Sequence, residues 1–293
     1  MTIVGVGLIG GSIGKALRAR GMADEVIGLG RDQARLALAQ SVGAIDSFTT
    51  HFEDSIPRSQ IVVICTPVDR ISADILQCAP FGHPDLLITD AGSTKRTIVE
   101  SVSQIADLAA HYVGAHPIAG SERSGVEASR ADLFERSLCV LTPMDSTPEK
   151  LCDRARNFWA SLGCHVESMT PAVHDEVLAQ MSHVPHVLAA ALARSVPASS
   201  LPFGGGAFRD VTRVAAADPS LWISILLENR EAVLQTLDQY LKSLHEFRSL
   251  LAQSDSDRLK IWWHEAKIQR GLFEQAQAQL ADRSRRSSSE IID

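Results

Sequence analysis

The sequence has no long hydrophobic run and no excess of positive charge. No stretch approaches the roughly 18 apolar residues that a membrane-spanning helix needs, so we expect no membrane span. With 28 Lys and Arg against 35 Asp and Glu, the formal net charge is −7. Such a charge gives no general attraction to nucleic acid or to an anionic membrane. An anionic ligand would therefore have to be held by local basic residues.

Cysteine is also scarce. The five cysteines are scattered over positions 65, 78, 139, 152 and 164, without any C-x-x-C pair. An odd, unclustered set argues against both a disulfide framework and a zinc site. We therefore expect no metal centre and a soluble protein of the reducing cytoplasm. Aromatic residues make up 5% of the chain and apolar residues 45%, which is an ordinary globular composition.

The chain does have a glycine-rich turn near its start. Ile3 and Val4 lead into G-x-G-x-x-G spacing, and a helical pattern follows. The first glycine makes the tight turn, the second lets backbone approach a pyrophosphate, and the third lets the helix pack on the strand. The free N–H groups of the helix N-terminus would then bind phosphate. We predict a dinucleotide site formed by Gly5, Val6, Gly7, Leu8, Ile9 and Gly10.

Strands and helices alternate to about residue 170. We expect further strands at 25–29, 61–65, 86–90, 111–114, 137–142 and 164–168, and helices at 9–20, 32–42, 68–78 and 94–109. The alternation predicts an α/β, Rossmann-type doubly wound sheet over residues 1–170. An all-α substrate and dimerisation domain is expected over residues 171–281. The Ser- and charge-rich tail at 282–293 is expected to be disordered.

Ligands of such sheets bind beyond the carboxyl ends of the strands. Arg31 stands about where NAD-binding domains carry an acidic residue for the ribose 2′-hydroxyl, which favours NADP over NAD as cofactor. The alternative is that Arg31 is solvated and Asp32 contacts the ribose. At the next strand end, Thr66 and Pro67 form a turn that could line the cofactor.

Two later strand ends carry candidate catalytic residues. Ser93 or Thr94 could cap the helix that follows them, and a cap at this edge can still face the active site. His116 follows a short apolar strand and is held by Pro117. Beside a nicotinamide it would be the base, because removing hydride from an alcohol needs a base with a pKa near ~6.5.

The helical half carries two further motifs. A helix expected at 171–195 has Ser182, His183 and His186 around Pro185, which should kink it. Glycines 204–206 precede Arg209 and Arg213, which are four residues apart and so would share one helical face. The two arginines could bind a carboxylate or simply form surface ion pairs.

A helix expected at 219–251 repeats leucine in steps typical of helix-to-helix packing. The seam is interrupted by Arg230 and Arg248, and a further aromatic-rich helix is expected at 255–281. The seam could join two subunits in a homodimer or be buried within one chain. Its leucines are Leu227, Leu234, Leu237, Leu241, Leu244 and Leu251.

Taken together, these motifs resemble the prephenate and arogenate dehydrogenase family of tyrosine biosynthesis. GVGLIGGS, CTP, DAGSTK, GAHPIAGSERSG, MSHVPH and FRDVTR occur in the family's order over nearly the full chain. The resemblance implies oxidative decarboxylation of prephenate to 4-hydroxyphenylpyruvate, or of arogenate to tyrosine, with hydride transfer to NAD(P)⁺. It also implies an intertwined helical dimerisation domain. Two departures are Gly30-Arg31 at the NAD-type acidic position, and Arg209 where many relatives have Lys.

The resemblance also implies roles for individual residues. His116 would accept the proton of the ring hydroxyl, Ser93 would help to hold that hydroxyl, and Arg213 would bind a substrate carboxylate. Further substrate-pocket positions would be Ser121, Glu122, Ser182, His186, Arg209 and Trp222.

Two other functions remain open from the residues alone. A β-hydroxyacid or 6-phosphogluconate type dehydrogenase shares this plan but uses a catalytic Lys, and only Lys242, Lys260 and Lys267 on long helices are candidates. A non-catalytic, nucleotide-sensing dimer would leave His116, Ser93 and Arg213 unexplained.

Overall fold

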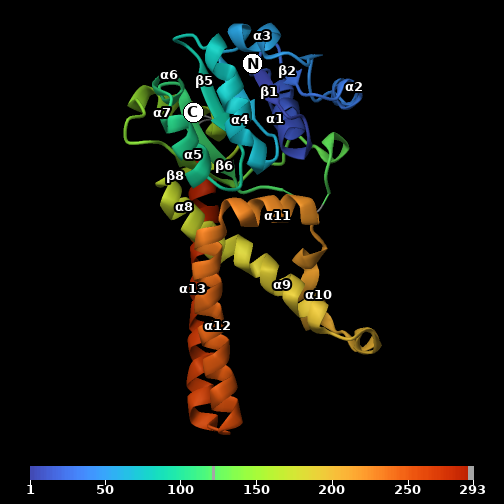
Figure 1. Ribbon diagram of the computed structural model, residues 1–293, viewed down its shortest axis with the longest axis vertical. Helices are drawn as coiled ribbons and strands as arrows, with labels where there is room; N and C mark the ends of the chain where they lie inside the picture. The colour runs from blue at the N-terminus through green and yellow to red at the C-terminus, as the bar shows by residue number, and fades with distance from the viewer. Residues whose placement is uncertain (121–122, 290–293) are drawn as a thin grey trace. The chain divides into compact units, whose positions relative to one another are not determined.

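The computed structural model describes residues 1–120 and 123–289 (Figure 1). The chain divides into two compact units, one from Met1 to Val233 and one from Leu234 onward. All the candidate site residues described below lie in the first unit. The predicted domain boundary at residue 170 stays a prediction, because the helices that follow it pack within the same unit as the sheet.

The first unit is built on an eight-stranded sheet with the order β3-β2-β1-β4-β5-β6-β7-β8. Neighbouring strands in the described residues pair in parallel, except for β6 and β7. The predicted doubly wound α/β sheet is therefore confirmed. Its strands are β1 (Thr2–Val4), β2 (Ile27–Leu29), β3 (Ser47–Thr49), β4 (Ile61–Ile64), β5 (Leu87–Asp90), β6 (Tyr112–Pro117), β7 (Leu138–Thr142) and β8 (His165–Ser168).

Helices cover both faces of the sheet. Because successive strand residues point to opposite faces, Ile3 and Val63 join one apolar cluster while Val4 and Ile64 join another. The first cluster includes residues of α1 (Leu8–Ala19), α2 (Gln33–Ser41) and α7 (Glu149–Ser161). The second includes residues of α4 (Val68–Cys78), α5 (Arg96–Ser103) and α6 (Ala106–Ala109). This burial on both faces explains why the central strands read as continuous apolar runs.

Several predicted elements differ in detail. The helix expected at 94–109 is the pair α5 and α6, and the short β3, α3 (Phe52–Ser55) and α7 were not predicted. Helix α7 had a readable signal, since Leu151, Ala155, Phe158 and Trp159 are buried at helical spacing.

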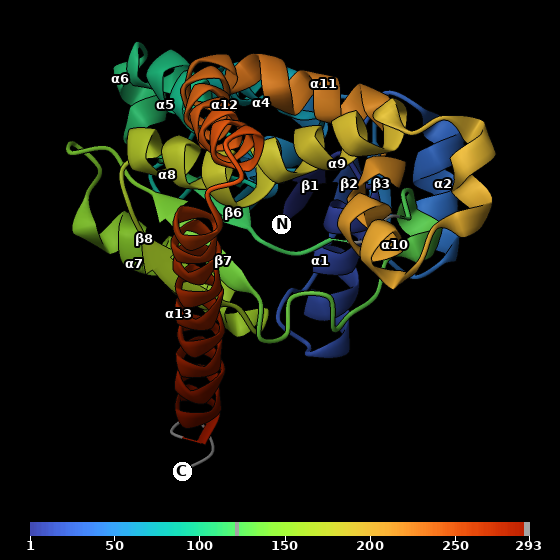
Figure 2. The same cartoon turned by 90° about the horizontal axis from the view of Figure 1, so that it is seen from below.

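The helical segment begins with α8 (Pro171–Leu178), which Thr170 caps by accepting from Val173 N. A π-helical segment (Ala179–His183) then joins α8 to α9 (Val184–Ser195). Pro185 lies in the first turn of α9, where the N–H that proline lacks is least needed. The expected kink takes the form of the π segment just before it. Figures 1 and 2 show α8 and α9 running below the sheet.

Later helices are α10 (Gly206–Thr212), α11 (Pro219–Glu228), α12 (Arg230–Ala252) and α13 (Ser256–Ser289). The single helix expected at 219–251 is wrong, because Asn229 separates α11 from α12. Helix α13 continues to Ser289, so the tail predicted to be disordered from residue 282 is helical up to that point. Residues 290–293 lie outside the described residues. Among the described helices, none is long and apolar enough to cross a membrane.

Candidate active site

The glycine turn after β1 has the geometry that its spacing predicts. Gly5 has φ +88°, and a Cβ there would lie 2.9 Å from the backbone of Cys65 and Thr66. A Cβ on Gly10 would lie 2.3 Å from the carbonyl oxygen of Gly5, so only glycine permits this approach of α1 to the strand. A Cβ on Gly7 would meet nothing within 4 Å. Space for a pyrophosphate therefore lies beside an N-terminus of α1 that no side chain caps.

The end of β2 separates the roles of Arg31 and Asp32. The carboxylate of Asp32 caps α2, accepting from Ala34 N at 3.0 Å and Arg35 N at 3.1 Å. Its second oxygen lies 3.5 Å from Arg35 Nε. Arg31 is exposed. Asp32 is therefore engaged in its own helix, which disfavours the alternative in which it contacts a ribose.

At the end of β4, the turn expected to line the cofactor faces the glycine turn through its backbone. The hydroxyl of Thr66 donates to the buried Asp74 carboxylate at 2.6 Å, and Pro67 stands just before α4. Thr66 is thus held by Asp74, while both its Cγ2 and its main-chain N lie against Gly5.

Beneath the candidate base lies a buried ion pair between Asp90 and Lys95, whose side chains are both fully buried. Asp90 also accepts from the Tyr112 hydroxyl at 2.7 Å, Gly92 N at 2.7 Å and Ala115 N at 3.3 Å. Burial, followed by the Asp90 charge, raises the pKa of Tyr112 well above its ordinary value. Since a buried charge is costly unless paired and hydrogen-bonded, this network locks the turn of residues 90–95 to β6.

The helix after this turn is capped from outside. Asp175 of α8 accepts from Lys95 N at 2.8 Å and from Arg96 N at 2.9 Å. The prediction that Ser93 or Thr94 caps the helix is wrong, because no side chain of its own segment does so. Ser93 is half-buried, and the buried Thr94 hydroxyl has no hydrogen-bond partner among the described residues. The Asp175 carboxylate therefore ties α8 to the carboxyl end of β5.

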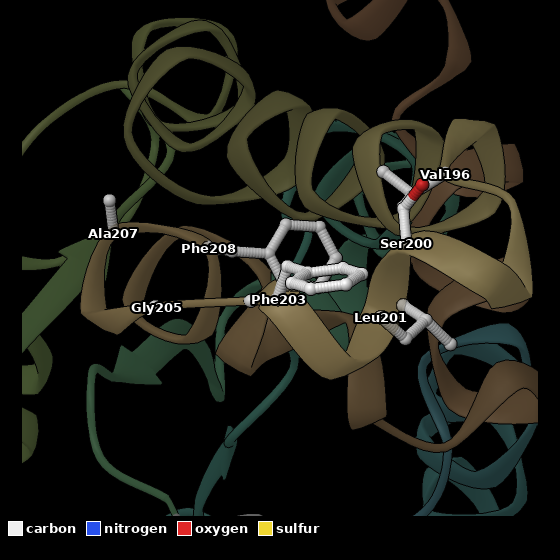
Figure 3. Close-up of a pocket in the computed structure, with 8 residues that line it drawn as sticks. Val196, Ser200, Leu201, Phe203, Gly205, Ala207 and Phe208 are labelled. Atoms are coloured by element: carbon white, nitrogen blue, oxygen red, sulfur yellow. The ribbon is translucent and has the colours of Figure 1, made fainter.

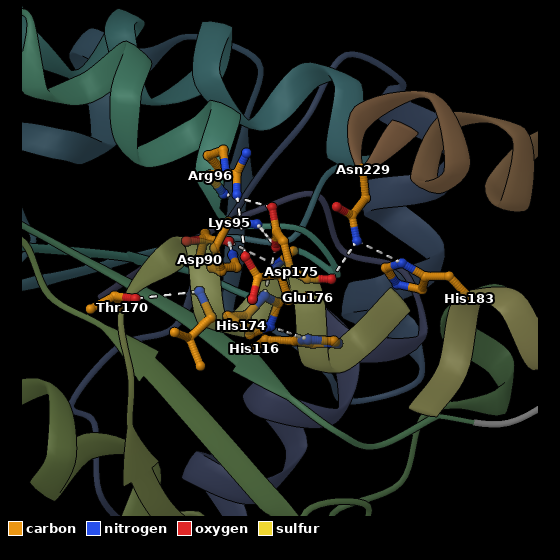
Figure 4. Close-up of polar contacts among 12 residues, drawn as sticks. Asp90, Lys95, Arg96, His116, Thr170, His174, Asp175, Glu176, His183 and Asn229 are labelled. Carbon is orange, nitrogen blue, oxygen red and sulfur yellow. Dashed lines mark hydrogen bonds and ion pairs between the residues drawn. The ribbon is translucent and has the colours of Figure 1, made fainter. Parts of the chain in front are cut away.

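His116 lies within β6 rather than after it, because the strand continues to Pro117. Its side chain is buried, and its Nδ1 lies 2.9 Å from Nε2 of His174. His174 Nδ1 lies in turn 2.7 Å from Asp175 Oδ1 (Figure 4). Burial, followed by His174, Lys95 and His183, lowers the pKa of His116 well below its ordinary value. At neutral pH His116 is therefore uncharged and able to accept a proton.

A second group of residues gathers around the π segment. The ring of His186 stacks on Trp222 with centroids 3.6 Å apart and an interplanar angle of 23°. His186 Nδ1 donates to the carbonyl oxygen of Ser182 at 2.8 Å. Burial lowers the pKa of His186, and the positive charge of Arg213 lowers it further. The structure thus brings His186, Trp222, Ser182 and Arg213 into one neighbourhood.

Other predicted site residues are placed differently. Arg209 is 81% exposed and pairs with Asp210. Helix α10 ends at Thr212 and Arg213 begins a 3₁₀ segment (Arg213–Ala216), so the shared helical face expected for Arg209 and Arg213 stays a prediction. Ser121 and Glu122 lie outside the described residues.

His174, Asp175 and Asn229 are not among the residues predicted from the sequence. A His-Asp pair soon after a helix start, that of α8, was the available signal for the first two. Asn229 donates through Nδ2 to the Asp175 carbonyl at 2.7 Å and lies 3.0 Å from His183 Nδ1. Its role depends on residues far apart in the chain, and no local pattern points to it.

Comparisons with known proteins agree over most of the chain. Residues 13–168 match the family model "Prephenate dehydrogenase, nucleotide-binding domain", and residues 170–265 match "Prephenate dehydrogenase, dimerization domain". The chain is 33% identical over 272 residues to prephenate dehydrogenase from Bacillus subtilis, covering 90% of this chain and 73% of that protein. It is 34% identical over 273 residues to cyclohexadienyl dehydrogenase from Zymomonas mobilis, covering 88% and 90%.

A solved structure is similar as well. The crystal structure of prephenate dehydrogenase from Aquifex aeolicus, in complex with hydroxyphenyl propionate and NAD⁺, superimposes with a TM-score of 0.85 at 33% identity. The similarity covers 92% of this chain and 96% of that one.

Proposed function

The chain belongs to the prephenate and arogenate dehydrogenase family, and from this premise we propose that it oxidises and decarboxylates prephenate, arogenate or both in L-tyrosine biosynthesis, with NAD(P)⁺ as hydride acceptor. The observation that carries the proposal is the buried, uncharged His116 at the same edge of the sheet as the open glycine turn. A base beside a dinucleotide site is what oxidation of a ring alcohol requires.

The reaction needs different residues at the two ends of the substrate, a base at the ring hydroxyl and a cation at a carboxylate. His116 accepts the proton of the ring hydroxyl while hydride leaves the same ring carbon, and the nicotinamide supplies the acceptor for that hydride. The ring carboxylate then departs as CO₂, and its bonding electrons enter the ring and make it aromatic. Ser93 helps to hold the hydroxyl, and the guanidinium of Arg213 binds a carboxylate through a geometry that matches it.

Further residues of the proposed substrate site lie around Arg213. His186 and Trp222 form a stacked pair there, and Ser182 holds His186 through its carbonyl. We assign Arg209, Ser121 and Glu122 to the same site by family resemblance alone. No metal is assigned a role, since loss of CO₂ and aromatisation supply the driving force.

NADP is the cofactor we favour. Arg31 at the end of β2 is exposed, and a cation at this position suits a 2′-phosphate better than a free 2′-hydroxyl. Asp32 caps α2, so its carboxylate is engaged where an NAD-type domain would offer one to the ribose. The backbone of residues 5–10, with Thr66 and Pro67, would hold the pyrophosphate and the adjoining ribose.

We further infer a homodimer that forms through the helical segment, in keeping with the matched dimerization domain. Several large apolar side chains there are exposed in the single chain, among them Phe203 at 88%, Leu227 at 65% and Val211 at 58%. Phe203 and Phe208 border an apolar cavity of about 280 Å³ (Figure 3). A second copy of the chain would cover these surfaces. Leu234, Leu241, Leu244 and Leu251 of the seam are also exposed.

The cytoplasm is the compartment that fits the cysteines. All five are free thiols, and a reducing compartment keeps such thiols unpaired.

The test is to supply prephenate and arogenate separately, each with NAD⁺ or NADP⁺, and to follow reduced nicotinamide by absorbance and CO₂ by release. We expect equal amounts of both products with at least one substrate, and faster turnover with NADP⁺. Cofactor binding without turnover of either substrate would instead support the nucleotide-sensing alternative.

A further inference from the structure

Two buried side chains, those of His174 and Asp175, extend in a line from the candidate base. His116 of β6 contacts His174 of α8 at 2.9 Å, with the two rings edge to face at 61°, and His174 contacts Asp175 at 2.7 Å (Figure 4). His174 is fully buried and Asp175 is 2% exposed. His116 and His174 are 58 positions apart in the chain, so the fold alone builds this line.

The hydrogen bonds of Asp175 fix the direction of the line. Burial opposes ionisation of Asp175, but the hydrogen bond from His174 and the backbone N–H groups of Arg96 and Lys95 outweigh it, so its pKa lies below the ordinary value. An ionised carboxylate only accepts hydrogen bonds. The proton of His174 is therefore on Nδ1, facing Asp175.

The protonation state of His174 in turn fixes which nitrogen of His116 carries the proton. Burial and the charge of Lys95 together lower the pKa of His174 more than Asp175 and Asp90 raise it, so the ring is neutral and its Nε2 has only a lone pair to offer. His116 Nδ1 must then be the donor across the 2.9 Å contact. Neutral His116 has one proton, which this bond places on Nδ1, and its Nε2 is left bare.

We propose that His174 and Asp175 are positioning residues that hold His116 in the tautomer with a bare Nε2, the only form in which that nitrogen can take a proton from substrate. The inference rests on the proposed function for the identity of that substrate, but the tautomer itself does not depend on it. The opposite tautomer would present an N–H to the hydroxyl, and catalysis would stop at that step.

The surroundings favour neutral rings over charged ones. Lys95 lies close enough to lower the pKa of both His116 and His174, and His183 lowers that of His116 further. Asp90 and Asp175 act in the opposite direction on His174. A proton added to His174 Nε2 would turn it into a donor, and His116 Nδ1 would then have to accept. The hydrogen bonds from His116 to His174 and from His174 to Asp175 therefore require both rings to be neutral.

The Asp175 carboxylate has a second consequence for the site. Through its bonds to Lys95 N and Arg96 N it fixes the turn that carries Ser93. The Asp175 side chain thereby sets both the tautomer of His116 and the position of the turn that carries Ser93.

The test measures both the tautomer of His116 and the kinetic constants of the enzyme. Enzyme labelled with ¹⁵N-histidine would be examined by two-bond ¹H–¹⁵N correlation spectra without substrate, with the His116 signals assigned by their loss in His116→Asn. We expect wild-type His116 to carry its proton on Nδ1. In His174→Phe the Nε2–H form should gain population and kcat should fall about 10- to 100-fold, part of the ~10²–10⁴ that a general base contributes. KM should change little, because substrate contacts are untouched.

His165→Phe is the matched control. His165 is also hydrogen-bonded to a carboxylate, that of Glu167 at 2.9 Å, but it lies in β8 outside the line. Its loss should change neither the His116 spectrum nor kcat.

Two results would overturn the proposal: a proton on Nε2 of wild-type His116, or a folded His174→Phe with an unchanged His116 tautomer and near-normal kcat. If His174→Phe does not fold, the wild-type spectrum decides alone. If the wild type shows the expected tautomer but turns over neither prephenate nor arogenate, the positioning role stands and the proposed function fails.

Discussion

His183 provides a direct test of the buried polar network through acid stability. Its Nδ1 faces Nδ2 of Asn229 at 3.0 Å, and the same Nδ2 donates to the Asp175 carbonyl at 2.7 Å. His183 Nδ1 must therefore accept, which requires a neutral ring. Turning the Asn229 amide over would place its oxygen against the Asp175 carbonyl oxygen, so the network has no easy way to accommodate a protonated His183.

The magnitude follows from the pKa of this group. Burial is the main cause that lowers the pKa of His183 from 6.5 to about 4. Because the folded-state pKa is the lower one, the stabilisation is present above pH 6.5 and is lost as the pH falls towards 4. At ~1.4 kcal/mol per pH unit, the full loss is about 3 kcal/mol, of which about 2 kcal/mol falls between pH 6.5 and 5.

The assay is urea unfolding of wild type and His183→Gln between pH 7.5 and 5, at fixed protein concentration because dimerisation also contributes to stability. Wild type should be the more stable protein at pH 7.5, and its advantage should shrink by about 2 kcal/mol by pH 5. His245→Gln, which alters an exposed histidine of α12, should show a constant difference from wild type. A constant difference for His183→Gln as well would refute the reasoning.

Three further predictions concern the cofactor and the dimer. Gly7→Ala should unfold like wild type yet bind the dinucleotide weakly, since its Cβ enters the open space left for the pyrophosphate. Gly10→Ala should instead lose stability, because its Cβ meets the Gly5 carbonyl at 2.3 Å. Thermal melts and cofactor titration distinguish the two variants, and equal losses of melting temperature would contradict this prediction. Arg31→Ala should weaken NADP⁺ binding by about 1–2 kcal/mol and leave NAD⁺ binding unchanged, and equal losses for both would count against the assignment. Sedimentation at low micromolar concentration should give about twice the 31.7 kDa chain mass, with Phe203→Asp shifting the protein towards monomer, and a fully active wild-type monomer would disprove a shared helical domain.

The sheet and the glycine turn could be predicted because their signals are local. Apolar runs separated by turns mark the buried strands, and the three glycines are read directly from their spacing. The direction of β7 was not predicted, and the short β3 was missed, since Ser47, Phe48 and Thr49 are half-buried and give no clear pattern.

The polar network of the site could be predicted only in part. The chain motifs pointed to His116, Ser93 and Arg213, but each was considered within its own segment. Asp175 caps a helix that begins 79 residues earlier. Asn229 lies 46 positions after His183, which it contacts, and it also hydrogen-bonds to Asp175 of α8. Such contacts depend on how the helices after residue 170 meet the edge of the sheet. This is also why a cap was wrongly expected from Ser93 or Thr94.

The central claim is that His116 is the base of a prephenate or arogenate dehydrogenase. The most direct test is the pH dependence of kcat/KM for wild type and His116→Asn, with whichever substrate the wild type turns over. The wild-type value should fall at low pH as His116 becomes protonated. The variant should lose ~10²–10⁴ in kcat with little change in KM, and its residual activity should lack the acidic limb. A variant that keeps near-normal kcat and the same acidic limb would contradict the account.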